Sequence, residues 1–359
     1  MAAADQTVLK TFSYRVKDAT SAKRLVALAN AVNVVWNYAN EISARSAERG
    51  TIWATKKQLR DLTNGSGKLL GLPSQVVQEV IDEFLIKRKS ARRPKLRWRA
   101  SRGARRALGW VPFTNQDIAL DGAVARLRGA PFRLWLHRPV EGRIKSGNFS
   151  QDARGRWYCN LVCEVERTCG AGKAEVGVDL GLKSVAKCSD GTGLEQAAFY
   201  RDLEPKLADA QRKKRRRRVR SIHAKIANRR KDSLHKFSRA LVNRARKITV
   251  GNVSASAMTK TRMAKSVLDA GWSVLRGMLR YKCDHAGVAY AEVDEAYTTQ
   301  TCSECGCIGG PKGLKDLAVR RWVCGDCGAE HDRDTNAALN IARLGCETPG
   351  LKGLRSPAF

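Results

Sequence analysis

The 359-residue chain is predicted to be an α+β protein with more than one domain. In its N-terminal part, segments of alternating apolar and polar residues, typical of strands, enclose a stretch with helical periodicity. Further along, strand-like and helical segments follow one another as in an α/β domain, and four cysteines near the C-terminus are spaced like the ligands of one zinc ion. A chain of this length accommodates two or three hydrophobic cores.

The first domain is expected to span residues 1–172. Alternating patterns predict strands at residues 7–17, 132–137 and 156–166, and these are expected to pair into a small β-barrel. After the first strand, apolar residues recur at helical spacing, which predicts a helical insertion at about residues 21–100.

A strongly basic segment, residues 87–106, follows the helical pattern. It is too charged for a core and too often interrupted by Gly, Pro and Ser for one regular element, so we expect a basic surface loop or hairpin. This segment and the helical stretch near Trp36 and Asn37 are candidates for nucleic-acid contact, although packing is the stronger interpretation of Trp36.

A second domain is expected to begin near residue 173. The predicted elements are two strands joined through Gly181, a long helical stretch at 202–246, a strand in KITVGNV, a helix at about 265–284 and a strand in VAYAEV.

The chain carries 67 Lys and Arg against 34 Asp and Glu, a formal net charge of +33. Such an excess indicates a polyanionic partner, most commonly nucleic acid. No apolar window is long enough to cross a membrane, and the first residues lack the pattern of a secretory signal, which argues against membrane and secreted proteins. We therefore expect a soluble, intracellular protein.

The core of the long helical stretch, residues 211–231, is basic yet keeps an apolar stripe. A solvated charged face or a localisation signal is the ordinary interpretation, but the net charge of the chain favours binding to phosphates. The candidate nucleic-acid-binding residues are Lys213, Lys214, Arg215, Arg216, Arg217, Arg218, Arg220, Arg229 and Arg230.

Four cysteines form two CxxC pairs, Cys302 with Cys305 and Cys324 with Cys327, separated by 18 residues. A glycine follows each pair and permits the tight turn that directs both sulfurs at one ion. This spacing predicts a structural zinc site of four thiolates. Unligated thiols are the alternative, and a catalytic zinc is disfavoured because four thiolates leave no open position. Cys307 is a poorly spaced competitor.

Two aspartates occupy positions suited to a metal. Asp179 lies within an apolar strand, where a buried carboxylate needs a partner such as a divalent cation, although it could instead cap the turn at Gly181. Asp334 follows Asp332 at the start of a helix expected at Thr335 to Arg343, where capping is again the alternative. With one further acid, the two aspartates would form a two-metal site that activates water toward a phosphodiester.

Several ordered motifs resemble those of one family. VGVDLG, KIANRRKDSLHKFSRALV, YTTQTCSECG, the CxxCG pair and DRDTNAALNI resemble the transposon-encoded TnpB proteins, OrfB-type relatives of type V CRISPR effectors, over residues 7–345. The resemblance implies an RNase H-like (RuvC) nuclease domain at 173–345, interrupted by a zinc ribbon at 299–331 and followed by a tail at 346–359. It also implies an N-terminal β-barrel with a helical recognition insertion, and a guide RNA from the transposon end that directs cleavage of double-stranded DNA, with magnesium or manganese as the catalytic metal. The expected location is then the bacterial cytoplasm, in association with the nucleoid.

By position, Asp179 matches the first catalytic carboxylate of the family and Asp334 the last. The sequence departs from the family at the middle one, because Gly251 and Asn252 stand where a glutamate is usual.

The neighbouring strand offers three replacement acids, Glu292, Asp294 and Glu295. Glu295 is preferred because it stands at the end of the strand, so the predicted catalytic and magnesium-binding set is Asp179, Glu295 and Asp334.

Three alternatives remain open at this stage. The site could have decayed, leaving an RNA-guided DNA-binding repressor that does not cut. A DNA-joining transposase also uses three acids on an RNase H-like fold. The third alternative is a simple zinc-ribbon module that binds nucleic acid, in which Asp179 and Asp334 would share no function.

Overall fold

The computed structural model describes residues 7–50, 53–168, 172–252, 271–312, 316 and 318–347. These residues divide into two compact units, 7–166 and 167–347. No helix among them is long and apolar enough to span a bilayer.

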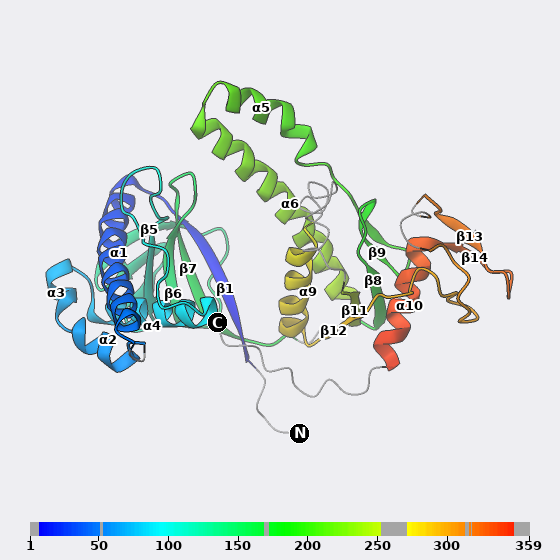
Figure 1. Ribbon diagram of the computed structural model, residues 1–359, viewed down its shortest axis with the longest axis horizontal. Helices are drawn as coiled ribbons and strands as arrows, with labels where there is room; N and C mark the ends of the chain where they lie inside the picture. The colour runs from blue at the N-terminus through cyan, green and yellow to red at the C-terminus, as the bar shows by residue number, and fades with distance from the viewer. Residues whose placement is uncertain are drawn as a thin grey trace. The chain divides into compact units, whose positions relative to one another are not determined.

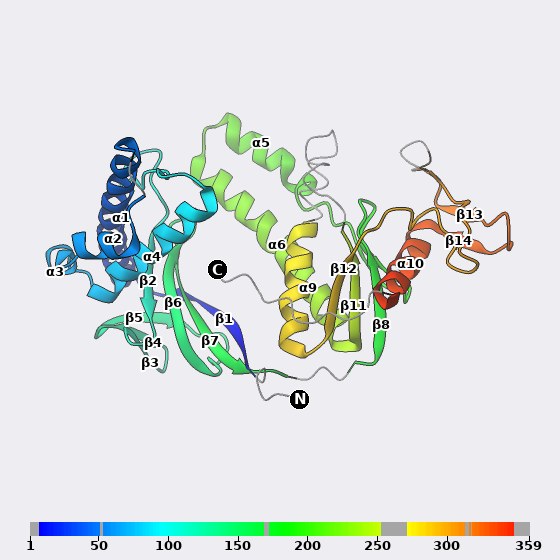
Figure 2. The ribbon, with the colours of Figure 1, turned by 60° about the horizontal axis from the view of Figure 1, so that its bottom comes forward.

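The N-terminal unit contains a seven-stranded antiparallel sheet in the order β2-β6-β7-β1-β5-β4-β3, which curls around its core (Figure 2). Alternate residues of its long strands are buried, as the period of two predicts. Pairing between the end strands β2 and β3 is not observed in the described residues. The strands are β1 (Thr7–Val16), β2 (Trp110–Thr114), β3 (Ile118–Asp121), β4 (Val124–Leu127), β5 (Ala130–Trp135), β6 (Arg143–Gln151) and β7 (Trp157–Glu166).

Four helices follow β1 and precede β2, where the sequence predicts a helical insertion. Asp18 caps the first of them by accepting a hydrogen bond from the backbone N–H of Ser21, at 2.7 Å. Apolar faces of the two longest helices join the core beneath the sheet. The helices are α1 (Ala19–Glu48), α2 (Lys56–Leu62), α3 (Ser66–Leu70) and α4 (Ser74–Ala91).

The C-terminal unit is built on a five-stranded sheet in the order β10-β9-β8-β11-β12. Strands β8, β11 and β12 are parallel, whereas β9 and β10 run antiparallel to their neighbours. Helices α6 and α9 cover one face and α10 the other (Figure 1). The elements are β8 (Ala174–Asp179), β9 (Ser184–Cys188), β10 (Gly193–Glu195), α6 (Arg216–Arg244), β11 (Ala245–Gly251), α9 (Trp272–Ala286), β12 (Ala289–Val293) and α10 (Arg333–Glu347).

The helical stretch expected at 202–246 is interrupted, and the prediction of one continuous helix is wrong. A short 3-10 turn, η1 (Arg201–Leu203), leads into α5 (Glu204–Arg212), and α6 starts only after a turn at Lys214, whose φ is +51°. The two helices fold back on each other because their apolar stripes pack together, burying Leu203, Leu207, Ala210, Ile222 and Ile226. The helix expected from residue 265 begins at Trp272, and residues 265–270 lie outside the described part.

Candidate metal centres

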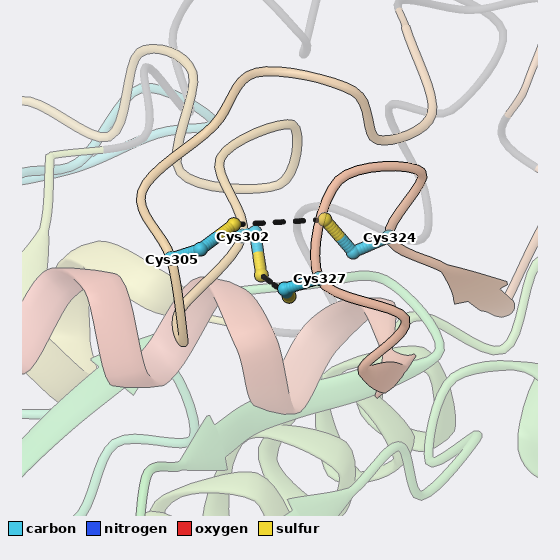
Figure 3. Close-up of side chains that lie close together, drawn as sticks. All are labelled: Cys302, Cys305, Cys324 and Cys327. Carbon is cyan, nitrogen blue, oxygen red and sulfur yellow. Dashed lines mark hydrogen bonds between the residues drawn. The ribbon is translucent and has the colours of Figure 1, made fainter.

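The four cysteines of the two CxxC pairs converge on one point. Their sulfurs all lie within 4.8 Å of one another, with 3.7 Å between Cys302 and Cys327 and 3.7 Å between Cys305 and Cys324 (Figure 3). Two thiolates on one tetrahedral zinc, with Zn–S bonds of about 2.3 Å, are about 3.8 Å apart. The four side chains therefore fit a single zinc ion.

Matching turns direct the two pairs. The N–H of Gly306 donates to the carbonyl of Cys302, and the N–H of Gly328 donates to the carbonyl of Cys324, each at 3.0 Å. Both glycines have positive φ angles, +81° and +72°, which residues with a Cβ rarely adopt. The second turn lies between two short paired strands, β13 (Arg321–Val323) and β14 (Glu330–Asp332).

A fifth thiol lies beside the cluster. The sulfur of Cys307 is 3.3 Å from that of Cys305 and 3.1 Å from that of Cys324. Both distances are shorter than two sulfurs on one zinc require, so Cys307 is a neighbour of the ligand set rather than a member of it. On the opposite side, His331 Nε2 lies 3.0 Å from Cys302 Sγ, within reach of an N–H donated to the sulfur.

The ends of three parallel strands bring the carboxylate candidates together. Val250 of β11 pairs with Val178 of β8 and with Glu292 of β12, so the three strands end side by side. Asp179 is the last residue of β8, and Glu295 follows β12 by two residues. Parallel strands gather the residues at their carboxyl ends along one sheet edge.

Gly251, at the end of the middle strand, leaves room for the side chain of Glu295. A Cβ placed on Gly251 would lie 2.8 Å from Glu295 Oε2 and 3.3 Å from Glu295 Cβ. Its backbone does not require glycine, since its φ is not positive. The carboxylate of Glu295 therefore lies over the point from which a side chain at position 251 would project.

The other two acids of the neighbourhood are engaged elsewhere. Glu292 forms ion pairs with Arg276 and Arg280 and accepts a hydrogen bond from the hydroxyl of Tyr290. Asp294 is exposed and accepts the backbone N–H of Ala296 in a local turn. Of the three acids considered in the sequence, Glu295 is the one beside Asp179.

Helix α10 brings Asp334 to the same edge because two glycines let it approach the sheet closely. A Cβ on Gly177 of β8 would lie 2.1 Å from the carbonyl oxygen of Ala338, and a Cβ on Gly345 would lie 2.1 Å from Thr249 of β11. Asp334 is the second residue of this helix.

Asp332, not Asp334, provides the cap of α10. The carboxylate of Asp332 accepts hydrogen bonds from the N–H and the hydroxyl of Thr335, at 3.0 and 2.9 Å. Asp334 instead accepts from Arg320 Nη1 at 3.1 and 3.2 Å. The capping interpretation of Asp334 is thus wrong, and its carboxylate is held by the guanidinium of Arg320.

The three carboxylates interact electrostatically. Burial raises the pKa of Asp179 to about 7, with further contributions from the negative charges of Asp334 and Glu295, while Arg333 acts in the opposite direction. Among the described residues, the oxygens of the three acids do not all come within 4.8 Å of one another, as the four sulfurs do. A divalent cation would offset their mutual repulsion, so the donor set suits magnesium or manganese.

Two asparagines of α10 hold the segment that links Glu295 to Cys302. The side-chain amide nitrogens of Asn336 and Asn340 both donate to the carbonyls of Thr298 and Thr301, at 2.7 to 3.2 Å. Asn336 Oδ1 also accepts the N–H of Ser303 at 2.9 Å. The sequence analysis missed Arg320, Asn336 and Asn340, although two asparagines four residues apart next to Asp334 are a visible pattern.

The predicted nucleic-acid-binding residues lie in the turn before α6, in its first turns and, for Arg229 and Arg230, near its middle. Three of them, Lys213, Lys214 and Arg215, belong to the turn, and Lys213 also forms an ion pair with Asp209. All nine side chains except that of Arg230, which is partly buried, are exposed. Five of the nine line two open hollows between α5 and α6: Lys214, Arg215, Arg216, Arg218 and Arg220.

Two family models match this chain. Residues 160–262 match the OrfB family, described as "Probable transposase", and residues 272–341 match the Cas12f1-like TNB domain. A solved structure of a Cas12f1-sgRNA-target DNA complex aligns with 94% of this chain and 99% of that chain, with a TM-score of 0.56 and 12% identity. At that identity, the likeness concerns the fold.

Relatives in sequence lead to the same family. A Streptomyces pristinaespiralis protein named "Putative RNA-guided DNA endonuclease" is 32% identical over 312 residues, covering 82% of this chain and 75% of the relative. Cas12f1 of Sulfoacidibacillus thermotolerans, a CRISPR-associated endodeoxyribonuclease, is 28% identical over 57% of this chain and 56% of its own length. A TnpB-like protein of Acanthamoeba polyphaga mimivirus is 33% identical over 40% of this chain and 28% of its own length. The chain belongs to the TnpB (OrfB-type) family, to which Cas12f1 is related.

Proposed function

We propose that the protein is an RNA-guided, metal-dependent DNA endonuclease encoded by an insertion sequence, with Asp179, Glu295 and Asp334 as its catalytic carboxylates. The observation that carries the proposal is the carboxylate of Glu295 over Gly251, next to Asp179. The names of the relatives support the same activity.

The sheet supports an RNase H-like (RuvC) assignment of residues 173–345. The strand order β10-β9-β8-β11-β12, with the central β8 flanked by one antiparallel and one parallel neighbour, agrees with it. The ribbon at residues 299–331 leaves the domain after Glu295 and returns before Asp334. Zinc at its four thiolates would then be structural, and would affect cleavage through the geometry of the segment held by Asn336.

The three carboxylates would hold two magnesium or manganese ions, which supply a nucleophilic water and stabilise the leaving oxygen when bound. The chain itself contributes three negative charges from separate elements, β8, the end of β12 and α10. Arg320, which pairs with Asp334, would have to exchange its partner when the cations bind, and a phosphate of the bound DNA would offer it another anion.

Guide RNA and double-stranded target DNA are the proposed partners. The net charge of +33 and the exposed arginines at the start of α6 support binding to phosphates. The Cas12f1 of the solved complex is bound to both an sgRNA and a target DNA. The transposon end is the proposed source of the RNA.

The test is to purify the protein expressed with its native downstream flank, sequence the bound RNA, and incubate the complex with a matching target plasmid and magnesium. We expect one discrete RNA and cleavage of the matched plasmid only. Asp179→Ala and Glu295→Gln should each lower cleavage by more than about 100-fold, the upper effect of losing an outer-shell partner of a metal ligand, while RNA and DNA binding persist.

Each other outcome points to a different function. Target binding without cutting by the unaltered protein would identify the nuclease-dead repressor, and strand transfer between DNA molecules would identify the transposase. The absence of a discrete RNA would refute guidance by RNA.

A further inference from the structure

The chain between α4 and β2 is irregular in secondary structure, yet its backbone is fixed along α1. Residues 92–106 carry eight Lys or Arg and no acid. Loops of this composition are usually mobile because their charges repel and they bury little apolar surface. Here four polar side chains of α1 hold the segment.

Two asparagines of α1 each bind both backbone groups of one residue. Asn40 accepts the N–H of Leu96 at 2.7 Å and donates to its carbonyl at 2.9 Å. Asn37 does the same for Arg99, at 2.8 and 3.0 Å. The side-chain amides thus replace the peptide groups of a neighbouring strand, which satisfies the backbone of a segment that has no strand partner there.

Two further side chains of α1 hold the flanks. Ser43 donates to the carbonyl of Pro94 at 2.7 Å, and Asn33 accepts from the guanidinium of Arg99 at 2.8 Å. Asn33, Asn40 and Ser43 are almost fully buried, at 3%, 1% and 0% exposure. Because buried polar groups must be paired, releasing the segment would leave these side chains unsatisfied, which keeps it in place.

The anchored segment presents a tryptophan among cations. Trp98 is 53% exposed, and Lys95, Arg97, Arg102 and Arg105 are exposed as well. None of these four cations forms an ion pair within the described part of the chain. Arg99 differs, because its guanidinium lies over the rings of Trp36 and Trp110, where burial lowers its pKa.

We propose that residues 94–106, here named the basic strip, bind an unpaired nucleic-acid strand, with Trp98 stacking on a base and Lys95 and Arg97 contacting phosphates. Aromatic side chains beside a positive track are the common means of holding single strands, because every base offers a flat face. In a duplex the bases are already stacked on one another, so no base face is free for the ring of Trp98 to stack on. The inference rests on the proposed function, since it assigns one contact of the RNA and DNA handled there.

The anchoring explains why such a contact would be strong. Ordering a loop at the moment of binding costs affinity, whereas the basic strip is already ordered by α1. An exposed tryptophan in a fixed backbone presents its ring at little further entropic cost, because only two side-chain angles remain.

The test measures binding of labelled single strands of about 15 nucleotides, near the upper site size of single-strand binders, to the full-length protein without magnesium. Oligouridine and oligothymidine form two arms that distinguish RNA from DNA, and a duplex of the same length forms a third. Trp98→Ala should weaken binding to at least one single strand by about 5- to 100-fold and change duplex binding by less than about 2-fold. Trp98→Phe should recover most of the loss.

Trp135 provides the matched control, because it is 60% exposed on β5 in the same unit. Trp135→Ala should leave all three affinities unchanged. The double variant Lys95→Gln/Arg97→Gln should reduce the dependence of log affinity on log salt by about 1.4, two single-strand phosphate contacts.

Equal effects of Trp98→Ala and Trp135→Ala, or an equal loss for single strands and duplex, would overturn the proposal. Neither outcome bears on cleavage at Asp179, so either one would refute the role of the basic strip and leave the proposed nuclease function standing. If the unaltered protein binds none of the three ligands, this proposal fails, whereas the proposed function is still decided by the co-purified RNA and by plasmid cleavage.

Discussion

The four thiols of the ribbon and the three carboxylates at the strand ends differ in how closely the protein chain alone gathers their ligand atoms. The sulfurs lie within 4.8 Å of one another with the spacing of a zinc tetrahedron, whereas the carboxylate oxygens do not reach that proximity. Thiols carry no charge until they are deprotonated, but ionised carboxylates repel one another. Turns and glycines therefore suffice to gather the four thiols, whereas the proposed catalytic carboxylates would need cations to come equally close.

Two features reduce the repulsion among the three carboxylates in the absence of a metal ion. Arg320 pairs with Asp334, and the raised pKa of Asp179 lets it retain a proton near neutral pH. Beside the thiol cluster, His331 is placed to donate an N–H to the sulfur of Cys302. The comparison predicts that substitutions at the thiols remove the bound zinc, whereas substitutions around the acids change the affinity for magnesium and the rate of cleavage.

The largest expected effect is loss of zinc. Cys324→Ser should reduce bound zinc from one ion per chain to nearly none, because three remaining thiolates bind far more weakly and the ribbon folds with its metal. Cys307→Ser should keep the full ion, since its sulfur is too close to two ligands to share their zinc. Elemental analysis of the purified variants measures the zinc bound per chain. Loss of zinc in Cys307→Ser would place that thiol in the ligand set.

A smaller effect is expected where the two sites are joined. Asn336→Ala removes two hydrogen bonds from the segment linking Glu295 to Cys302, and it leaves the N–H of Ser303, just after that segment, unsatisfied. We expect cleavage to fall by about 10- to 100-fold, the usual loss for an outer-shell partner, and the magnesium requirement to rise while zinc is retained.

Asn340→Ala is the matched control for that variant. Its amide donates to the same two carbonyls, which Asn336 still serves, so the loss should be smaller. A variant of Asn336 that loses zinc but keeps the magnesium requirement of the unaltered protein would contradict the coupling.

The smallest expected effect concerns stability and pH. The pKa of Asp179 is about 7 in the folded protein and about 3.8 as an ordinary aspartate, so the folded state holds a proton that the unfolded state releases between these values. The stability of the magnesium-free, zinc-loaded protein should therefore fall as pH rises from about 4 to 7. Asp179→Asn should raise the free energy of unfolding by about 1–3 kcal/mol at pH 8 and by much less at pH 4. Chemical denaturation at both pH values measures this, and an equal change at both would exclude Asp179 as the source.

The sequence predicted features that depend on local spacing. Two CxxC pairs, each followed by glycine, identify the thiol ligands because the turn geometry is local, and Asp179 and Asp334 were found from motifs around them. Glu295 was predicted because Gly251 stands where the family usually has a glutamate. The pairing of β11 with β12 explains why an acid after β12 can lie beside Gly251.

Other features depend on contacts that spacing does not encode. Arg320 meets Asp334 only because the ribbon returns to the sheet, and the asparagines of α10 bind carbonyls some 35 to 42 residues earlier. The break between α5 and α6 was missed because Lys214, a residue that gives no turn signal, adopts a positive φ there. Apolar periodicity continues on both sides of that turn, so it resembles one helix.

The most direct test of the central claim moves the middle glutamate from position 295, just after β12, to position 251 at the end of β11. Glu295→Ala should abolish plasmid cleavage, and adding Gly251→Glu to that variant should restore a substantial part of it, because removal of the Glu295 carboxylate clears the atom 2.8 Å from the new Cβ. Gly251→Glu alone should be destabilised by crowding against Glu295. Cleavage by Glu295→Ala at the rate of the unaltered protein would contradict the account.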